Sequence, residues 1–124
     1  MIILDSSVWI GYFTNAKEFQ MIEEYVTSEE IITPTIVLYE VFKRCLGLLG
    51  EEQALLSTSF MKDHSTIIEL TETIALCAAR ISTEEKLAMA DAIIAATADI
   101  HRVTIMTSDA DLKNRKNVKY IAKK

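Results

Sequence analysis

Short apolar runs alternate along this 124-residue chain with longer segments that have helical periodicity. The apolar runs predict strands at 1–4, 30–33, 66–70, 103–106 and 118–121. Helical spacing, capping hydroxyls and terminating glycines predict helices at 6–12, 16–27, 34–46, 51–62, 71–81 and 86–101, with Thr33 as the N-cap and Pro34 as the first residue of the third helix. Strands that alternate with helices form βαβ units. We therefore expect an α/β fold of three layers, with a short, mostly parallel sheet of four or five strands between helices.

The composition is that of an ordinary globular domain. Half of the residues are hydrophobic, so a core can form without disulfides, and we expect one domain over residues 1–124. Cys45 and Cys77 lie in apolar helical patterns, which favours buried thiols in a cytoplasmic protein. We expect no signal peptide and no membrane span. The net charge of −5 gives no sign of a nucleic-acid partner, although it does not exclude a local basic patch.

Acidic residues stand just after the predicted strands or on the helices that follow them. Asp5 follows the first strand, Glu40 lies in the helix after the second, Asp91 lies near the start of the alanine-rich helix, and Asp109 follows the fourth strand with Asp111 two residues later. In parallel α/β sheets, active sites form beyond the carboxyl ends of the strands. Carboxylates that converge there require a cation, and hard oxygen ligands suit Mg²⁺ or Mn²⁺.

Each acid, taken alone, has a purely structural explanation. Asp5 could cap the helix that follows it. Glu40 could pair with Arg44 one turn later on the same helix. Asp91 could favour a helix N-terminus, and Asp109 and Asp111 could belong to a turn. It is the order and the context of the four acids together that favour a shared site.

Four segments of the chain resemble the PIN domain family, most closely the VapC-type ribonuclease toxins. These segments are "IILDSSVWI" at the start, "TPTIVLYEV" around Glu40, "LAMADAIIAATA" around Asp91 and "IMTSDADL" near the end. The resemblance spans nearly the whole chain and implies a PIN-like parallel sheet flanked by helices. In this chain, Leu112 stands where the family usually has an aromatic residue, and the family often has Asn in place of Asp109.

The resemblance also implies a site and an activity. Asp5, Glu40, Asp91 and Asp109 match the family's catalytic, metal-binding acids, while Asp111 is an alternative to Asp109 as the fourth. Ser6 and Thr107 match hydroxyl positions that line the same pocket. Family members bind Mg²⁺ or Mn²⁺ and cut RNA, many form homodimers, and the toxins are inhibited by an antitoxin partner.

We therefore expect a metal-dependent endoribonuclease that uses a metal-activated water. The alternatives are a PIN-like scaffold that binds RNA or protein without catalysis, and a PIN nuclease of RNA processing rather than a toxin. Candidate RNA contacts are Lys43, Arg44, Lys113 and Arg115.

Other residues argue against rival chemistries. His64 and His101 lie in a predicted loop and at a helix end, which disfavours a histidine-pair mechanism. A haloacid-dehalogenase-type phosphatase requires a second acid where Ser7 stands. Trp9, Tyr12 and Phe13 could stack on bases, but their spacing favours packing.

Overall fold

The computed structural model describes residues 1–28 and 30–123. Among these residues, the strands are β1 (Ile2–Leu4), β2 (Ile31–Pro34), β3 (Thr66–Ile68), β4 (Thr104–Thr107) and β5 (Val118–Tyr120). The α-helices are α1 (Ser6–Phe13), α2 (Ile22–Ser28), α3 (Thr35–Leu49), α4 (Glu51–His64), α5 (Glu72–Glu85) and α6 (Met89–His101), with the 3-10 turns η1 (Lys17–Phe19) and η2 (Ala110–Leu112). The strands form one sheet in the order β3-β2-β1-β4-β5, with all neighbours parallel. The predicted fold class is confirmed.

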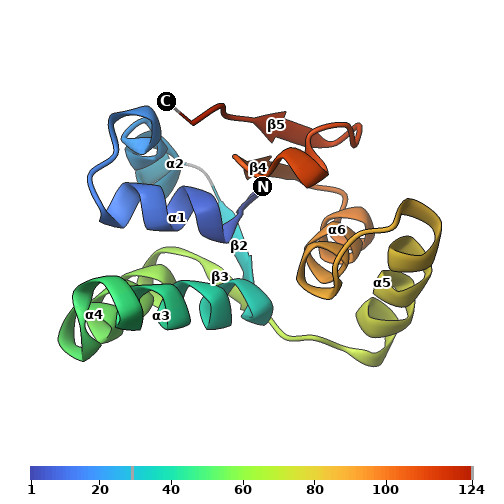
Figure 1. Cartoon of the computed structure of the whole chain (residues 1–124), viewed down its shortest axis with the longest axis horizontal. Helices are drawn as coiled ribbons and strands as arrows, with labels where there is room; N and C mark the ends of the chain where they lie inside the picture. The colour runs from blue at the N-terminus through green and yellow to red at the C-terminus, as the bar shows by residue number, and fades with distance from the viewer. Residues whose placement is uncertain (29, 124) are drawn as a thin grey trace.

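Helices pack in pairs on the two sides of the strands (Figure 1). The pair α3 and α4 lies on one side of the view, and α5 and α6 lie together on the other. Residues 92–98 of α6 are all buried, because one side of this helix meets the strands and the other meets α5. A helix enclosed on both sides has little room for large side chains, which explains the run of alanines. This packing also fixes the position of Asp91, near the start of α6.

The boundary of α3 differs slightly from the prediction. Thr33 belongs to β2, and its hydroxyl is 2.7 Å from that of Ser65 instead of capping the helix. Pro34 is therefore the N-cap residue, one position later than expected. The helix also runs three residues beyond the predicted end, to Leu49, where Gly50 adopts a φ of 89°. A positive φ is a conformation that glycine adopts readily, so this residue ends the helix.

Other predicted helices also had different limits: α4 ends at His64 rather than at residue 62, and α5 runs to Glu85 rather than to residue 81. The segment 16–27 is not continuous, because the short turn η1 precedes α2. The alanine-rich helix begins at Met89 rather than at Lys86, and Lys86 instead ends α5 in the left-handed conformation, with a φ of 58°. Periodicity continues across such breaks, so the sequence pattern joined segments that the backbone separates. The later start places Asp91 in the first turn of α6.

The aromatic residues that follow Asp5 pack inside the protein, as their spacing predicted. Trp9 is fully buried and stacks on Phe13 with ring centroids 5.7 Å apart. Phe60 of α4 contacts both rings edge-on. These contacts fasten α1 to α4 and hold the start of α1, where Asp5 lies, against the rest of the fold.

Gly11 and Gly47 give a matched pair of tests for this packing. A Cβ at Gly11 would overlap the ring of Phe19, whereas a Cβ at Gly47 would meet open space. We expect Gly11→Ala to lower the free energy of unfolding by about 1–3 kcal/mol, because the buried ring must move. Gly47→Ala should raise it by about 0.5–1 kcal/mol through helix propensity. Urea unfolding of both variants measures the difference, and equal effects of the two substitutions would contradict the packing described here.

Within the described residues, no helix is both long and apolar enough to cross a membrane. The free cysteines differ in burial: Cys45 is buried, while Cys77 is partly exposed.

Candidate metal centre

Asp5 combines a structural role with a place in a polar network. Its Oδ1 accepts the Ser6 N–H at 2.8 Å, so the predicted capping role at α1 is confirmed. Its Oδ2 accepts the Thr107 hydroxyl at 2.6 Å and the Ser7 hydroxyl at 3.4 Å. The residue is 3% exposed. A buried carboxylate with three donors is held in one orientation, which is what a ligand residue requires.

The end of β4 extends this network. β4 neighbours β1, so Thr107 reaches Asp5 across the sheet, and its Oγ1 also accepts the Asp109 N–H at 2.9 Å. The Ser108 N–H donates to the Ser7 hydroxyl at 3.1 Å. Asp109 Oδ1 in turn accepts the Asp111 N–H at 2.9 Å and caps η2, which confirms the predicted turn. The capping bonds and the shared site are therefore compatible.

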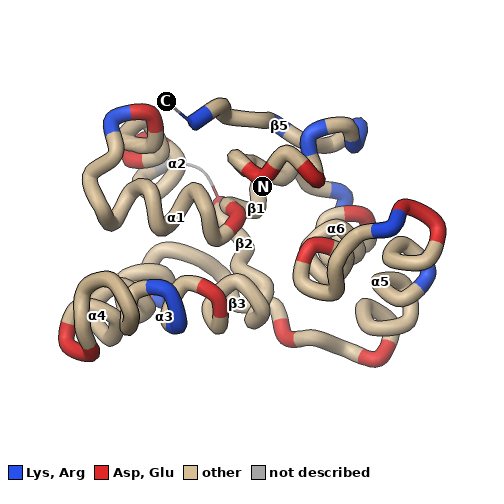
Figure 2. The backbone as a smooth tube through the Cα atoms, viewed as in Figure 1, with Lys and Arg blue, Asp and Glu red and all other residues tan. Residues whose placement is uncertain are grey.

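The four predicted acids meet at one cavity. Asp5, Glu40, Asp91 and Asp109 come from the end of β1, from α3, from α6 and from the β4–η2 connection. Together they line a space of about 300 Å³, which is also lined by Ser6, Ser7, Ser108, Ala110 and Lys123. Figure 2 shows acidic positions on the elements that supply these residues, around the middle of the view. The cavity lies beyond the carboxyl ends of β1 and β4, where ligands bind in parallel sheets.

Burial and the charges of neighbouring carboxylates raise the pKa values of three acids of this cavity. Burial is the main cause that raises the pKa of Asp5 above its ordinary value, while the bond from Thr107 opposes that rise. Burial and the charge of Asp5 raise the pKa of Glu40, while a hydrogen bond with Ser6 opposes them. Burial, followed by the charges of Asp109 and Asp5, raises the pKa of Asp91 to about 7. Acids perturbed by burial and by one another are typical of functional sites, and a cation would relieve the repulsion between them.

The donor set fits a hard divalent cation. Among the described residues, carboxylate oxygens of Asp91, Asp109 and Asp111 lie within 4.8 Å of one another. Oxygen-only ligands at such spacing suit Mg²⁺ or Mn²⁺. Asp109 lines the cavity and its charge raises the pKa values of the other three acids, whereas Asp111 is exposed. This arrangement favours Asp109 over Asp111 as the fourth acid.

The predicted basic residues fall into two groups. Lys43 and Arg44 line a space of about 600 Å³ between α1 and α3 that also reaches Ser6 and Glu40. Within the part of the chain that the structure describes, Arg44 forms no ion pair with Glu40. The Lys113 ammonium lies over the Tyr120 ring, 5.7 Å from its centre. The Arg115 guanidinium is bound by Glu85 and Asp99, so it is not free to contact a phosphate.

Four residues that line the cavity were not predicted as site residues: Ser7, Ser108, Ala110 and Lys123. Ser7 entered the sequence analysis only as the position where a phosphatase would require an acid, yet its hydroxyl joins Asp5 to the backbone of Ser108. Lys123 lines the acidic cavity although it is more than 110 positions from Asp5 along the chain. No spacing or periodicity connects a lysine near the end of the sequence to the first strand. By contrast, the sequence does hold a signal for Ser7. This residue directly follows Ser6 and lies in the first turn of α1, two residues after Asp5.

Comparisons with known proteins agree with this geometry. A family model described as the PIN domain matches residues 2–118. A toxin–antitoxin complex from Klebsiella pneumoniae superposes with a TM-score of 0.80 at 25% identity, covering 96% of each chain. VapBC2 from Rickettsia felis, bound to a promoter DNA fragment, gives 0.79 at 18% identity, covering 98% of this chain and 99% of that one. VapC20 from Mycobacterium tuberculosis, a sarcin-ricin loop cleaving toxin, gives 0.81 at 15% identity with the same two coverages. A search of curated proteins returned no significant match.

Proposed function

Because the chain belongs to the PIN domain family, we propose that it is an endoribonuclease that depends on Mg²⁺ or Mn²⁺ and hydrolyses RNA phosphodiester bonds. The observation that carries this proposal is the convergence of Asp5, Glu40, Asp91 and Asp109 on one cavity at the carboxyl ends of β1 and β4. When bound there, a divalent cation supplies activation of water and neutralisation of charge at the phosphate.

The chain's own groups hold this centre in place. Thr107 and the Ser6 N–H orient the Asp5 carboxylate through hydrogen bonds of 2.6 and 2.8 Å. Glu40 and Asp91 approach from helices on either side, and Asp109 approaches from the end of β4. We infer that the four carboxylates hold the cation. The histidines support this assignment, because neither His64 nor His101 lines the acidic cavity within the described residues.

We propose that the RNA backbone approaches along Lys43, Arg44 and Lys123. Lys43 and Arg44 line the space next to Glu40. Arg44 and Lys123 both line a further space of about 380 Å³ beside Ser6 and Ser7, and Lys123 continues into the acidic cavity. Cations on the approach to a carboxylate site offset the repulsion between those acids and the phosphates. Lys113 stays a proposed contact outside this approach, whereas Arg115 is left out because Glu85 and Asp99 bind it.

The effect of Arg44 on substrate binding tests this approach. We expect Arg44→Ala to raise KM for a short RNA about tenfold with a smaller change in kcat, since one phosphate contact acts mainly on binding. The KM should also become less sensitive to salt. Lys62→Ala is the matched control, because Lys62 is exposed on α4 just before β3 begins, near the amino ends of the parallel strands and away from the cavity at their carboxyl ends. Equal effects of the two substitutions on KM would remove Arg44 from the path.

The partners of the protein are proposed from its relatives. The Klebsiella and Rickettsia structures are described as toxin–antitoxin or VapBC assemblies, which supports a toxin role with an antitoxin partner. We further propose a homodimer, as is common in this family, that acts in the cytoplasm, where free thiols such as Cys45 and Cys77 persist.

A cleavage assay separates this proposal from the alternative of a non-catalytic scaffold. Labelled single-stranded RNA and DNA of the same sequence are incubated with the purified protein in Mn²⁺ and in EDTA. We expect the RNA to be cut in Mn²⁺ and to stay intact in EDTA. RNA that is bound but stays intact in Mn²⁺ as well as in EDTA would favour the scaffold, if the melting temperature of the protein also stays unchanged on adding Mn²⁺.

A further inference from the structure

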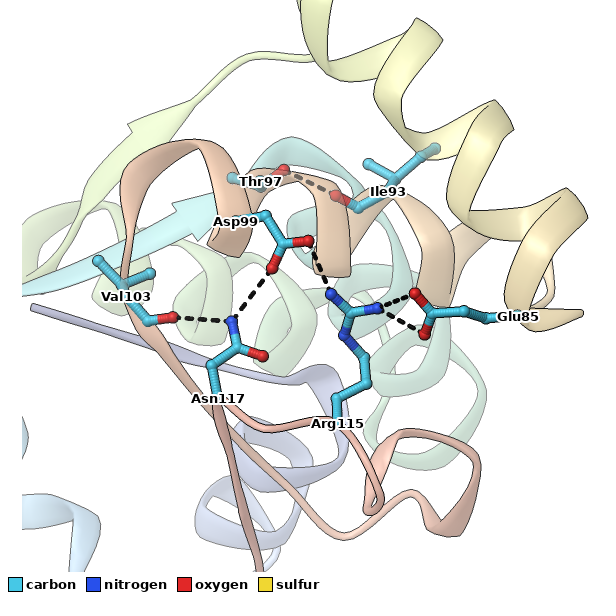
Figure 3. Close-up of polar contacts among 7 residues, drawn as sticks. All are labelled: Glu85, Ile93, Thr97, Asp99, Val103, Arg115 and Asn117. Atoms are coloured by element: carbon cyan, nitrogen blue, oxygen red, sulfur yellow. Dashed lines mark hydrogen bonds and ion pairs between the residues drawn. The ribbon is translucent and has the colours of Figure 1, made fainter.

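Arg115 joins three segments of the chain that are distant in sequence. Its Nη1 donates to both carboxylate oxygens of Glu85 at 2.6 Å, and its Nη2 donates to Asp99 Oδ2 at 2.7 Å (Figure 3). Glu85 is the last residue of α5, and Asp99 lies in the last turn of α6. Arg115 itself lies in the connection between η2 and β5. Asn117 adds to the same cluster by donating to Asp99 and to the Val103 carbonyl.

The geometry is that of a built contact rather than a solvated surface pair. The Arg115 side chain is 14% exposed, although those of Glu85 and Asp99 are each 41% exposed. Its Nε is buried and has no hydrogen-bond partner among the described residues. Exposed ion pairs contribute little to stability, but an arginine that bridges two carboxylates with charge-assisted hydrogen bonds from two nitrogens is held in a defined direction.

The cluster is connected to the acids of the cavity through η2, although it lies near the start of β4 and the cavity lies at the end of this strand. Asp109 caps η2, Asp111 lies within it, and the Arg115 N–H donates to the carbonyl of Leu112 at 3.1 Å. Leu112 is fully buried against α5 and α6. The segment from Asp109 to Arg115 is therefore held at two points, by Leu112 in the apolar core and by Arg115 on its two acids.

The same contact bears on Asp91. Asp91 and Asp99 are both on α6, eight residues apart, so a rigid helix of about 12 Å joins them. Arg115 connects the far end of this span to the segment that carries Asp109 and Asp111. The relative position of the carboxylates that lie within 4.8 Å of one another thus depends on a link between the two elements that carry them.

We propose that Arg115 is a positioning residue of the metal centre, which holds the Asp109–Asp111 segment against α6 so that the Asp109 carboxylate shares a cation with Asp91. The inference rests on the proposed function, since it assumes that the acids bind a divalent ion. It assigns to Arg115 a role that differs from RNA contact, because the guanidinium acts through the backbone of its own segment.

The test is the affinity for Mn²⁺ of the full chain, measured from the electron paramagnetic resonance signal of free Mn²⁺. We expect Arg115→Gln to weaken Mn²⁺ binding about 10- to 100-fold, the range typical when a group that orients metal ligands is lost. Arg115→Lys keeps the charge but cannot bridge both acids, so its affinity should lie between those of Arg115→Gln and the wild type. Lys116→Gln, an exposed neighbour that lines the same face, should bind Mn²⁺ like the wild type.

A triple variant separates positioning from simple stabilisation. Arg115→Gln removes the cation that binds Glu85 and Asp99, which lowers stability. Adding Glu85→Gln and Asp99→Asn removes the two charges that this cation balanced, so the melting temperature should recover while the Mn²⁺ affinity stays low. If the triple variant recovers its Mn²⁺ affinity as well as its melting temperature, the positioning role is overturned while the proposed function stands. Wild-type Mn²⁺ affinity in Arg115→Gln itself would have the same meaning. A wild-type protein that binds no Mn²⁺ would overturn both.

Discussion

Replacing Asp91 by Asn is expected to abolish cleavage of RNA and, at the same time, to stabilise the metal-free protein. Asparagine has nearly the same shape but no negative charge, so the cavity loses a proposed ligand. We expect cleavage to fall by about 100- to 1,000-fold, the loss typical of removing one strong electrostatic contact to a transition state. Stability should rise because burial and the charges of Asp109 and Asp5, which raise the pKa of Asp91 to about 7, no longer act on an ionised group.

The two opposite effects make this variant informative. The gain in stability should grow as the pH rises from about 4, the pKa of an aspartate in an unfolded chain, to about 7, because over this range the folded wild type keeps a proton that the unfolded chain has lost. Thermal melts in EDTA at several pH values measure the gain. Asp63→Asn, on the exposed end of α4, is the matched control and should change neither property. An Asp91→Asn protein that is less stable than the wild type at pH 8 would show that Asp91 serves the fold, as a residue of the first turn of α6.

Binding of Mn²⁺ is expected to stabilise the wild-type protein, and more so at pH 8 than at pH 5. A cation binds ionised carboxylates, and at pH 5 protons compete for Asp91, whose pKa is about 7. Binding at a free concentration 100-fold above Kd adds about 2.7 kcal/mol. For a domain of this size, that corresponds to a rise in melting temperature of about 10 °C.

The rise in melting temperature on adding Mn²⁺ should depend on the Asp5 carboxylate. In Asp5→Asn, the hydrogen bond from the Ser6 N–H can still form to the side-chain carbonyl, so the cap of α1 is kept while the charge is lost. The Mn²⁺-induced rise should shrink strongly in this variant and stay unchanged in Asp63→Asn. A rise of equal size in wild type and Asp5→Asn, or one that is larger at pH 5 than at pH 8, would place the cation away from this cavity.

The sheet and the acidic cavity could be predicted from the sequence because both depend on local patterns. Buried parallel strands are short apolar runs, and an acid directly after such a run lies at the carboxyl edge of the sheet wherever the strand is placed. This reasoning brought Asp5 and Asp109 together correctly, since β1 and β4 are neighbours. It also placed Glu40 and Asp91 on helices, and the resemblance of the surrounding segments linked them to the same site.

The limits of the helices and the surroundings of Arg115 could not be predicted in this way. Lys86 continues the helical pattern of its neighbours, yet its left-handed backbone ends α5, and residues 86–88 separate α5 from α6. Arg115 is one basic residue among several near the end of the chain, and the acids that bind it lie 30 and 16 positions away. Lys123 reaches the cavity through tertiary folding in the same manner. Contacts between residues so far apart leave no periodicity for a sequence pattern to detect.

The chemistry of the cut ends tests the central claim most directly. A labelled RNA is incubated with the wild-type protein in Mn²⁺, and the ends of the products are identified. Attack by water at the acidic cavity predicts 5′-phosphate and 3′-hydroxyl ends, formed in Mn²⁺ and absent in EDTA. Products that carry 2′,3′-cyclic phosphates, or cleavage that persists in EDTA, would contradict the assignment of this cavity as a metal-dependent nuclease centre.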